Sequence, residues 1–175
     1  KNIELINKRK PYLVGEFGFV STSGTESTLD FVIDNNDVCG ALIWSLRHHR
    51  KKGGFYWHSE PLGYGRYKAY HWPGFDSGSE YDEKALFSLM RKKGFEISGI
   101  KPPKLNAPST PELLPIKHSS AISWKGSTGA SSYDVFRSEE KNGSFDLIEY
   151  NISDAVNQYV PLYDDTTVEI GKTYY

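Results

Sequence analysis

The segment VCGALIWSL, residues Val38–Leu46, is a nearly unbroken run of apolar residues and constrains the fold more than any other part of the chain. It is too short to cross a membrane, which takes about 20 apolar residues in a helix. A strand with one solvent-exposed face alternates apolar and polar residues, and this segment does not. It matches instead a strand that is covered on both faces, as parallel strands are. The segment therefore predicts a buried strand of a parallel sheet.

Helical and strand patterns alternate around this segment. Asn2–Lys10 has the pattern of a helix end that Pro11 stops, and Tyr12–Val14 is then predicted to be a buried strand. A helix is predicted over Thr25–Asn35, with Ser23 or Thr25 as its cap. A longer helix begins at a predicted cap, Ser79, and is predicted to end at Gly94. This order predicts βαβ units in a parallel sheet.

The pattern changes after a proline-rich stretch, Gly99–Pro115. Short strands are predicted at Ala121–Trp124, Ser132–Ser138 and Phe145–Tyr150, and such spacing is typical of a β-sandwich. Asn142-Gly143 has the composition of a tight hairpin turn with positive φ. We predict three regions: an α/β part over 1–100, a linker over 101–110, and an all-β part over 111–175.

The composition excludes several partners and sites. A net charge of −1 and a pI of about 6.6 give no field that would recruit nucleic acid or an acidic membrane surface. The single cysteine, Cys39, cannot form an internal disulfide, and its apolar neighbours predict a small core side chain. The only methionine is Met90, and the sequence has no signal peptide and no span of membrane length. We expect the chain to be a fragment at both ends.

Two residues at predicted strand ends are candidates for chemistry. Glu16, in KPYLVGEFGF, follows the first strand, and the C-terminal ends of parallel strands are where α/β barrels keep their active sites. A carboxylate there is suited to act as a nucleophile or a general acid or base, although strand-end acids also bind metals or cap helices. Trp44 closes the next strand, where an indole either stacks on a sugar ring or fills the core.

A long aromatic loop follows Trp44 and contains four of the five histidines: His48, His49, His58 and His71. Loops over the catalytic face of a sheet often carry function, so we predict a ligand surface here. A zinc site is the alternative, but the adjacent His48 and His49 diverge in a strand and the spacing matches no helical ligand motif. We predict no metal.

KPYLVGEFGF, the helix after it, VCGALIWSL and the aromatic loop resemble the end of a (β/α)8 glycoside hydrolase of the family 5 type, similar to β-mannanases and cellulases. The resemblance implies that residues 1–100 supply the seventh and eighth βα units of this TIM barrel. It implies that Glu16 is the catalytic nucleophile and that Trp44 forms the floor of the sugar subsite beside the cleaved bond. Further substrate-binding candidates are His48, His49, Tyr56 and Trp57.

The second half resembles a fibronectin type III domain, with the proline-rich start, Trp124 in its second strand and YDVFRS in its third. This module is predicted to be incomplete, because GKTYY lies inside its sixth strand. Such modules often follow secreted bacterial enzymes that degrade polysaccharides. The resemblance therefore implies a secreted, cell-surface or periplasmic protein.

The implied activity is O-glycosyl hydrolysis of a β-linked mannan or glucan, with no cofactor and with a poly- or oligosaccharide as substrate. A complete barrel takes roughly 250 residues, and the acid/base of this family ends the fourth strand, which residues 1–100 do not include. We therefore expect the chain alone to be inactive and to require the N-terminal part of the barrel as a partner. The alternative is a non-catalytic carbohydrate-binding or adhesion protein.

Overall fold

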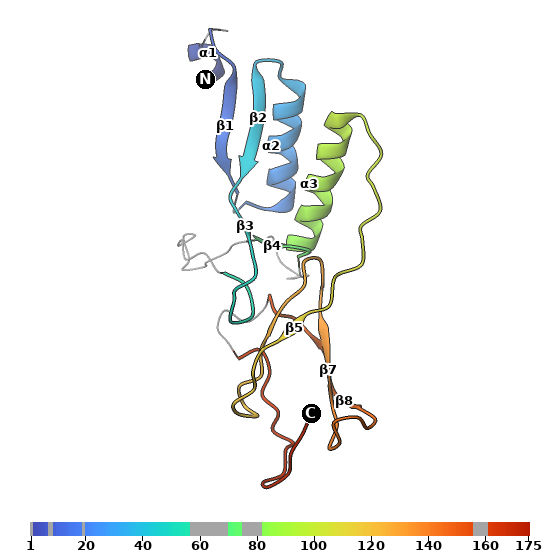
Figure 1. Cartoon of the computed structure of the whole chain (residues 1–175). Coiled ribbons are helices and arrows are strands. Elements are labelled where there is room, and N and C mark those ends of the chain that lie inside the picture. The colour runs from blue at the N-terminus through green and yellow to red at the C-terminus, as the bar shows by residue number, and fades with distance from the viewer. Residues whose placement is uncertain (1, 7–8, 19, 57–69, 75–81, 156–160) are drawn as a thin grey trace. The chain divides into compact units, whose positions relative to one another are not determined.

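The chain folds as two compact units, one formed by Lys1–Leu46 with His58–Leu105 and the other by Arg47–Trp57 with Asn106–Tyr175 (Figure 1). The computed structural model describes residues 2–6, 9–18, 20–56, 70–74, 82–155 and 161–175. The division at Leu105 lies within the predicted linker. The inclusion of Arg47–Trp57 in the second unit was not predicted from the sequence.

The first unit contains the predicted βαβ arrangement. Its elements begin with α1 (Asn2–Ile6), β1 (Tyr12–Phe17), α2 (Thr22–Asp34) and β2 (Val38–Ile43). β1 and β2 pair in parallel, with Leu13 opposite Gly40 and Val14 opposite Ala41. The predicted parallel pairing is confirmed. Whether further strands close this sheet into a barrel stays a prediction.

The prediction that both strands are buried on two faces is wrong for the described sheet. Leu13 is 48% exposed and Leu42 is 57% exposed. Cys39 is also exposed, and so it is not the predicted core side chain. The reason is that the sheet has two strands, and α2 packs against β2 while these side chains stay in contact with solvent.

Both longer helices have ends that differ from the predicted ones. Ser21, rather than Ser23 or Thr25, caps α2 by accepting a hydrogen bond from the Gly24 N–H at 3.1 Å. The predicted cap of the last helix, Ser79, lies outside the described residues.

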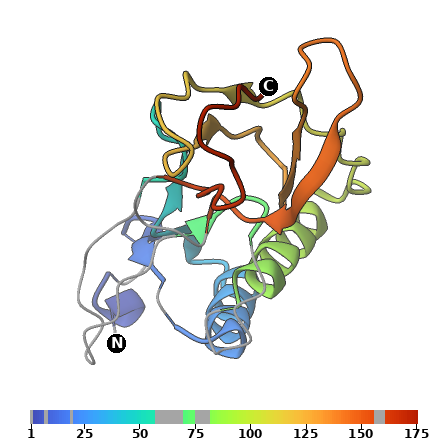
Figure 2. The same cartoon turned by 90° about the horizontal axis from the view of Figure 1, so that it is seen from below.

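The last helix, α3 (Glu83–Ser98), begins after Asp82, whose Oδ1 accepts hydrogen bonds from Lys84 N and Ala85 N. It continues past Gly94 and ends at Gly99 in the left-handed conformation, with φ +66°. The prediction that Gly94 ends the helix is therefore wrong. α2 and α3 lie side by side (Figures 1 and 2), and Lys93 Nζ lies 2.5 Å from Asp30 Oδ1.

A buried pair ties the start of α3 to a short strand. Beyond β3 (Leu46–Arg47), β4 (Tyr70–His71) places His71 Nδ1 3.1 Å from Glu83 Oε1, and both side chains are fully buried. The Tyr70 N–H donates to the Ser45 carbonyl at 3.1 Å. These contacts attach the N-terminus of α3 to the backbone immediately after Trp44.

The second unit is built from antiparallel pairs. β5 (Glu112–Leu113) pairs with β6 (Trp124–Lys125), and β7 (Tyr133–Arg137) pairs with β8 (Asp146–Ile152). Trp124, Ile122 and Leu162 form the core, and the Trp124 and Tyr133 rings lie 5.3 Å apart. The prediction that Trp124 is a core residue is confirmed, as is the alternation along β7, whereas Tyr133 is partly buried and packs against the core. A complete sandwich stays a prediction.

The predicted turn between the two strands is present, since the Gly143 N–H donates to the Glu140 carbonyl at 3.1 Å and closes a β-turn. The positive φ predicted for Asn142-Gly143 is wrong, because neither residue has it. The physical reason is that β7 ends at Arg137 and β8 begins at Asp146, so the connection is long enough to turn without left-handed residues.

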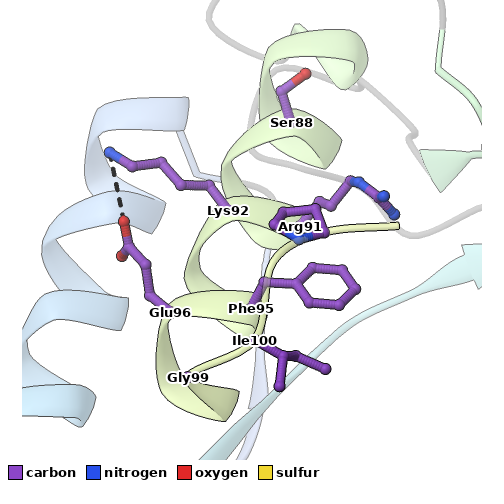
Figure 3. Close-up of a pocket in the computed structure, with 8 residues that line it drawn as sticks. Ser88, Arg91, Lys92, Phe95, Glu96, Gly99 and Ile100 are labelled. Carbon is purple, nitrogen blue, oxygen red and sulfur yellow. Dashed lines mark ion pairs between the residues drawn. The ribbon is translucent and has the colours of Figure 1, made fainter. Parts of the chain in front are cut away.

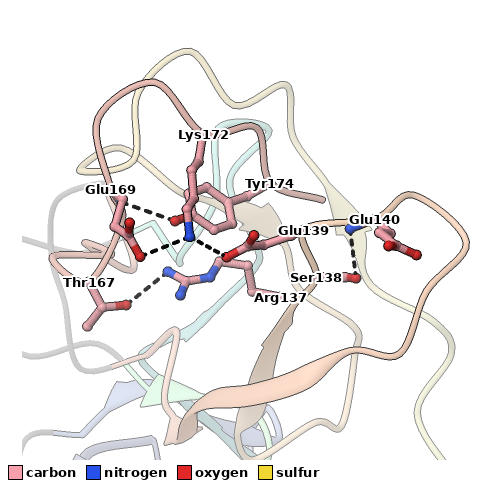
Figure 4. A network of polar contacts seen from close by, with 8 residues as sticks. All are labelled: Arg137, Ser138, Glu139, Glu140, Thr167, Glu169, Lys172 and Tyr174. Carbon is pink, nitrogen blue, oxygen red and sulfur yellow. Dashed lines mark hydrogen bonds and ion pairs between the residues drawn. The ribbon is translucent and has the colours of Figure 1, made fainter.

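A polar network stabilises the end of β7 (Figure 4). Arg137 Nη1 donates to Asp165 Oδ2 at 2.7 Å and to Thr167 Oγ1 at 2.9 Å. Burial acts to raise the pKa of Asp165, but hydrogen bonds from Thr167 and Arg137 outweigh it and hold that pKa below its ordinary value. Lys172 forms an exposed ion pair with Glu139 at 2.9 Å. The buried Asp165 pair therefore carries more of the stabilisation than the exposed one.

We predict opposite effects for alanine at the two glycines of α3. Gly94→Ala should raise the free energy of unfolding by about 1 kcal/mol, because a methyl group there meets no atom within 4 Å and alanine favours helix. Gly99→Ala should lower it by about 1 kcal/mol, because alanine resists the left-handed conformation. Urea unfolding followed by circular dichroism measures both. Destabilisation by Gly94→Ala would contradict a helix that continues past Gly94.

Candidate functional site

Glu16 lies near the C-terminal end of β1, and its side chain is exposed. The alternative that it caps the following helix is wrong, because Ser21 caps α2. Among the residues that the structure describes, no three His, Cys, Asp or Glu side chains gather as they would around a metal ion. An accessible carboxylate at the end of a parallel strand is the arrangement that a nucleophile requires.

Trp44 follows β2 directly and is joined to the strand of Glu16 through the backbone. Its N–H donates to the Phe17 carbonyl at 2.7 Å, which extends the β1–β2 pairing to both strand ends. The peptide bond between Trp44 and Ser45 is cis, and Trp44 is partly exposed rather than buried in the core. The structure thus brings the two predicted residues to the same edge of one sheet.

Gly18 permits this close approach. A Cβ at Gly18 would overlap the Trp44 carbonyl oxygen, whereas a Cβ at Gly15 would meet no atom within 4 Å. The two glycines that flank Glu16 therefore differ in role. Gly18 lets the neighbouring strand end come near, as glycines do where two backbones pass closely.

The 47–56 segment of the second unit is a hairpin with two different faces. His49 pairs with Phe55, the Arg50 N–H donates to the Gly54 carbonyl at 2.8 Å, and the Tyr56 N–H donates to the His48 carbonyl at 3.1 Å. Because side chains alternate along a strand, His48 and Tyr56 lie on one face while His49 and Phe55 lie on the other. The predicted residue Trp57 lies outside the described residues.

The face with His48 and Tyr56 is exposed. Their ring centroids lie 4.7 Å apart, and Tyr56 is 47% exposed. The Arg50 guanidinium carbon lies 5.9 Å from the centre of the Tyr56 ring. The two rings are tilted by 47°, and the exposed Tyr56 ring beside this cation offers a face on which a sugar ring can stack, with polar groups that its hydroxyls can hydrogen-bond.

The opposite face of the hairpin is buried inside the second unit. The rings of His49 and Phe55 lie 4.1 Å apart, and His49 Nε2 lies 3.1 Å from Asp154 Oδ2. The two side chains of this pair are only 11% and 2% exposed. His49 is therefore engaged by the protein itself, and of the two predicted histidines only His48 is available to a ligand.

Sequence reasoning missed the partner of His49 and the hairpin itself. The Gly53-Gly54 pair, which directly precedes Phe55-Tyr56, was a usable sign of a hairpin. Nothing near Asp154 in the sequence indicates that it would meet His49, since the two are far apart along the chain.

A pocket of about 590 Å³ lies at the C-terminal end of α3 in the first unit (Figure 3). Neither Glu16 nor Trp44 lines it. Its charged groups already have partners, because Arg91 donates to the Pro103 carbonyl and Lys92 lies 3.9 Å from Glu96. The pocket is therefore a weaker candidate than the strand ends.

A scan against protein-family models finds no match, and neither the curated proteins nor the solved structures contain a match to this chain. None of the helices in the described part of the chain is both long and apolar enough to cross a membrane. The strand ends and the hairpin are therefore the features on which a function can be based.

We predict that Gly18→Ala loosens the junction between the strand ends and that Gly15→Ala does not. The methyl group at Gly18 must displace the Trp44 carbonyl, and overpacking of this kind typically costs about 1–3 kcal/mol. Hydrogen exchange at the Trp44 amide reports on the bond to Phe17 and should become faster only in Gly18→Ala. Equal exchange in both variants would contradict the close approach.

Proposed function

We propose that this chain supplies the nucleophile of a retaining glycoside hydrolase that cleaves a β-linked polysaccharide of the mannan or glucan type. The observation that carries the proposal is the exposed Glu16 carboxylate at the end of a parallel strand whose neighbour ends in Trp44. The resemblance to family 5 hydrolases supports the same two roles. A polymeric substrate is degraded outside the cytoplasm, which agrees with a secreted, cell-surface or periplasmic enzyme.

In this mechanism a Glu16 oxygen attacks the anomeric carbon while the bond to the leaving oxygen breaks. A second carboxylic acid protonates that oxygen, and the sugar remains on Glu16 as an ester. Water, deprotonated by the second carboxylate, then attacks the anomeric carbon and releases the sugar with its configuration retained. Trp44 supports the ring at the reacting position. No cofactor takes part.

The second carboxylate must lie about 5–5.5 Å from the nucleophile in a retaining enzyme. The family resemblance assigns it to an earlier strand than β1, so we expect it in the N-terminal part of the barrel. The exposed Leu13 and Leu42 support this expectation, because parallel sheets are normally covered on both faces. On this proposal the chain alone does not hydrolyse polysaccharide.

We predict that Glu16→Gln, made in a protein that joins this chain to the rest of the barrel, lowers kcat on β-mannan or β-glucan by roughly 10⁴-fold or more, as expected when a covalent nucleophile is removed. The dissociation constant for an oligosaccharide should change little, because glutamine keeps the shape. Reducing-sugar release and calorimetry measure the two quantities. Glu26→Gln, on the exposed surface of α2, is the matched control. Full activity of Glu16→Gln would refute the nucleophile assignment.

A second function, non-catalytic carbohydrate binding, is favoured by the exposed pair of His48 and Tyr56 in the second unit. This surface needs no second carboxylate. It therefore supports sugar binding by the chain as it stands, whether or not Glu16 is part of an enzyme.

We predict that Tyr56→Ala weakens binding of a β-1,4-linked oligosaccharide about fivefold, since stacking on an aromatic ring contributes roughly 1 kcal/mol. Tyr150→Ala is the control, because Tyr150 is also exposed in the same unit but has no place in the hairpin. Affinity electrophoresis in mannan- and glucan-containing gels compares the variants. Unchanged migration of Tyr56→Ala would remove the hairpin from the binding surface.

A further inference from the structure

We propose that the second unit positions the sugar-binding face of the 47–56 hairpin through a buried clasp, in which His49, Asp154 and Tyr133 converge on Gly126. The inference rests on the proposed carbohydrate binding by His48 and Tyr56. It makes His49 and Asp154 positioning residues, which act on the ligand through the hairpin.

Three polar side chains converge on Gly126 and leave no room for a Cβ atom there. A Cβ at Gly126 would overlap Asp154 Oδ2, and it would lie 2.5 Å from His49 Nε2 and 2.6 Å from Tyr133 Oη. Real Cβ atoms do not tolerate such contacts. The residue at 126 must therefore be glycine for the hairpin to reach Asp154.

Two close polar contacts hold the clasp together. Asp154 lies 3.1 Å from His49, and the Ser127 N–H donates to Tyr133 Oη at 2.9 Å. Burial of the phenol, together with the nearby Asp154 carboxylate, raises the pKa of Tyr133 above its ordinary value. Tyr133 thus keeps its proton, and its hydroxyl converges with the Asp154 carboxylate over Gly126. Opening the clasp would separate the buried Asp154 carboxylate from His49, and a buried carboxylate without a partner is costly, so opening is disfavoured.

A second anchor holds the tip of the hairpin. Gly53 has φ +96°, and a Cβ there would lie 2.9 Å from the Trp124 carbonyl oxygen and 3.2 Å from Ser123 Cβ. Phe55 is buried. The tip therefore rests on the backbone at the start of β6, beside the core of the second unit.

These anchors matter because an isolated two-stranded hairpin is only marginally stable in water. With His49 and Phe55 held on the buried face, alternation directs His48 and Tyr56 to the exposed face. The hairpin belongs to the same unit as residues 106–175, although it is far from them in the sequence. The rest of the second unit thus supports the binding surface.

The test uses the full chain and compares Gly126→Ala with Gly94→Ala, a glycine with no atom within 4 Å of its added methyl group. We expect Gly126→Ala to speed hydrogen exchange at the Arg50 and Tyr56 amides at least about tenfold, because those bonds open locally when the hairpin detaches. Affinity for mannan or glucan oligosaccharides should fall with it. Gly94→Ala should change neither.

Asp154→Asn keeps the size of the side chain and tests the clasp even where Gly126→Ala unfolds the second unit. We expect faster exchange in the hairpin with the amides of β7 and β8 unchanged, and weaker oligosaccharide binding. Unchanged hairpin exchange in Asp154→Asn would overturn the clasp. Faster exchange with unchanged affinity would overturn the positioning role.

Tyr56→Ala separates this inference from the proposed function. It removes a stacking ring but leaves the clasp, so affinity should fall while exchange at the Arg50 amide stays as in the wild type. If the wild-type chain binds neither oligosaccharide, carbohydrate binding and the positioning role both fail. The exchange data from Asp154→Asn still decide whether the buried clasp exists.

Discussion

The hydrogen bond from the Trp44 N–H to the Phe17 carbonyl, 2.7 Å long, determines what the first unit can do. It continues the parallel pairing of β1 and β2 to the last residues of both strands, and Gly18 leaves room for it. It therefore keeps the two strand ends, which carry Glu16 and Trp44, in register. Steric freedom at Gly18 is what lets these strand ends approach each other.

The local sequence pattern predicted which segments form helices and strands better than it predicted where they end or how deeply they are buried. Apolar periodicity found α2, β2 and β7 because each depends on neighbours a few residues apart. It misplaced the end of α3 because a helix tolerates an interior glycine at a cost of about 1 kcal/mol, and packing against α2 compensates for Gly94. It overestimated the burial of β2 because burial depends on which other elements cover the sheet, and no local pattern records that.

In the candidate site, too, the local sequence does not determine whether a given residue is buried or exposed. The placement of Glu16 and Trp44 at neighbouring strand ends was predictable, because the direction of parallel strands brings their C-terminal ends together. His48 and His49 are adjacent and identical in type, yet one is exposed and the other is paired with Asp154. Alternation predicts that they diverge. Only the tertiary structure decides which of them faces the protein, because Asp154 and Gly126 lie far away in the sequence.

The two exposed apolar residues of the β1–β2 sheet, Leu13 and Leu42, bear on how Glu16 could work. In the proposed enzyme, further strands cover this face and exclude water from the strand ends. Exclusion of water strengthens electrostatic interactions, so the carboxylate would stabilise positive charge at the anomeric carbon more than it could in solvent. In the described β1–β2 sheet, the side chains of Leu13 and Leu42 are exposed to solvent. The proposed carbohydrate binding on the hairpin needs no such cover, so it does not depend on the missing strands that the proposed hydrolysis requires.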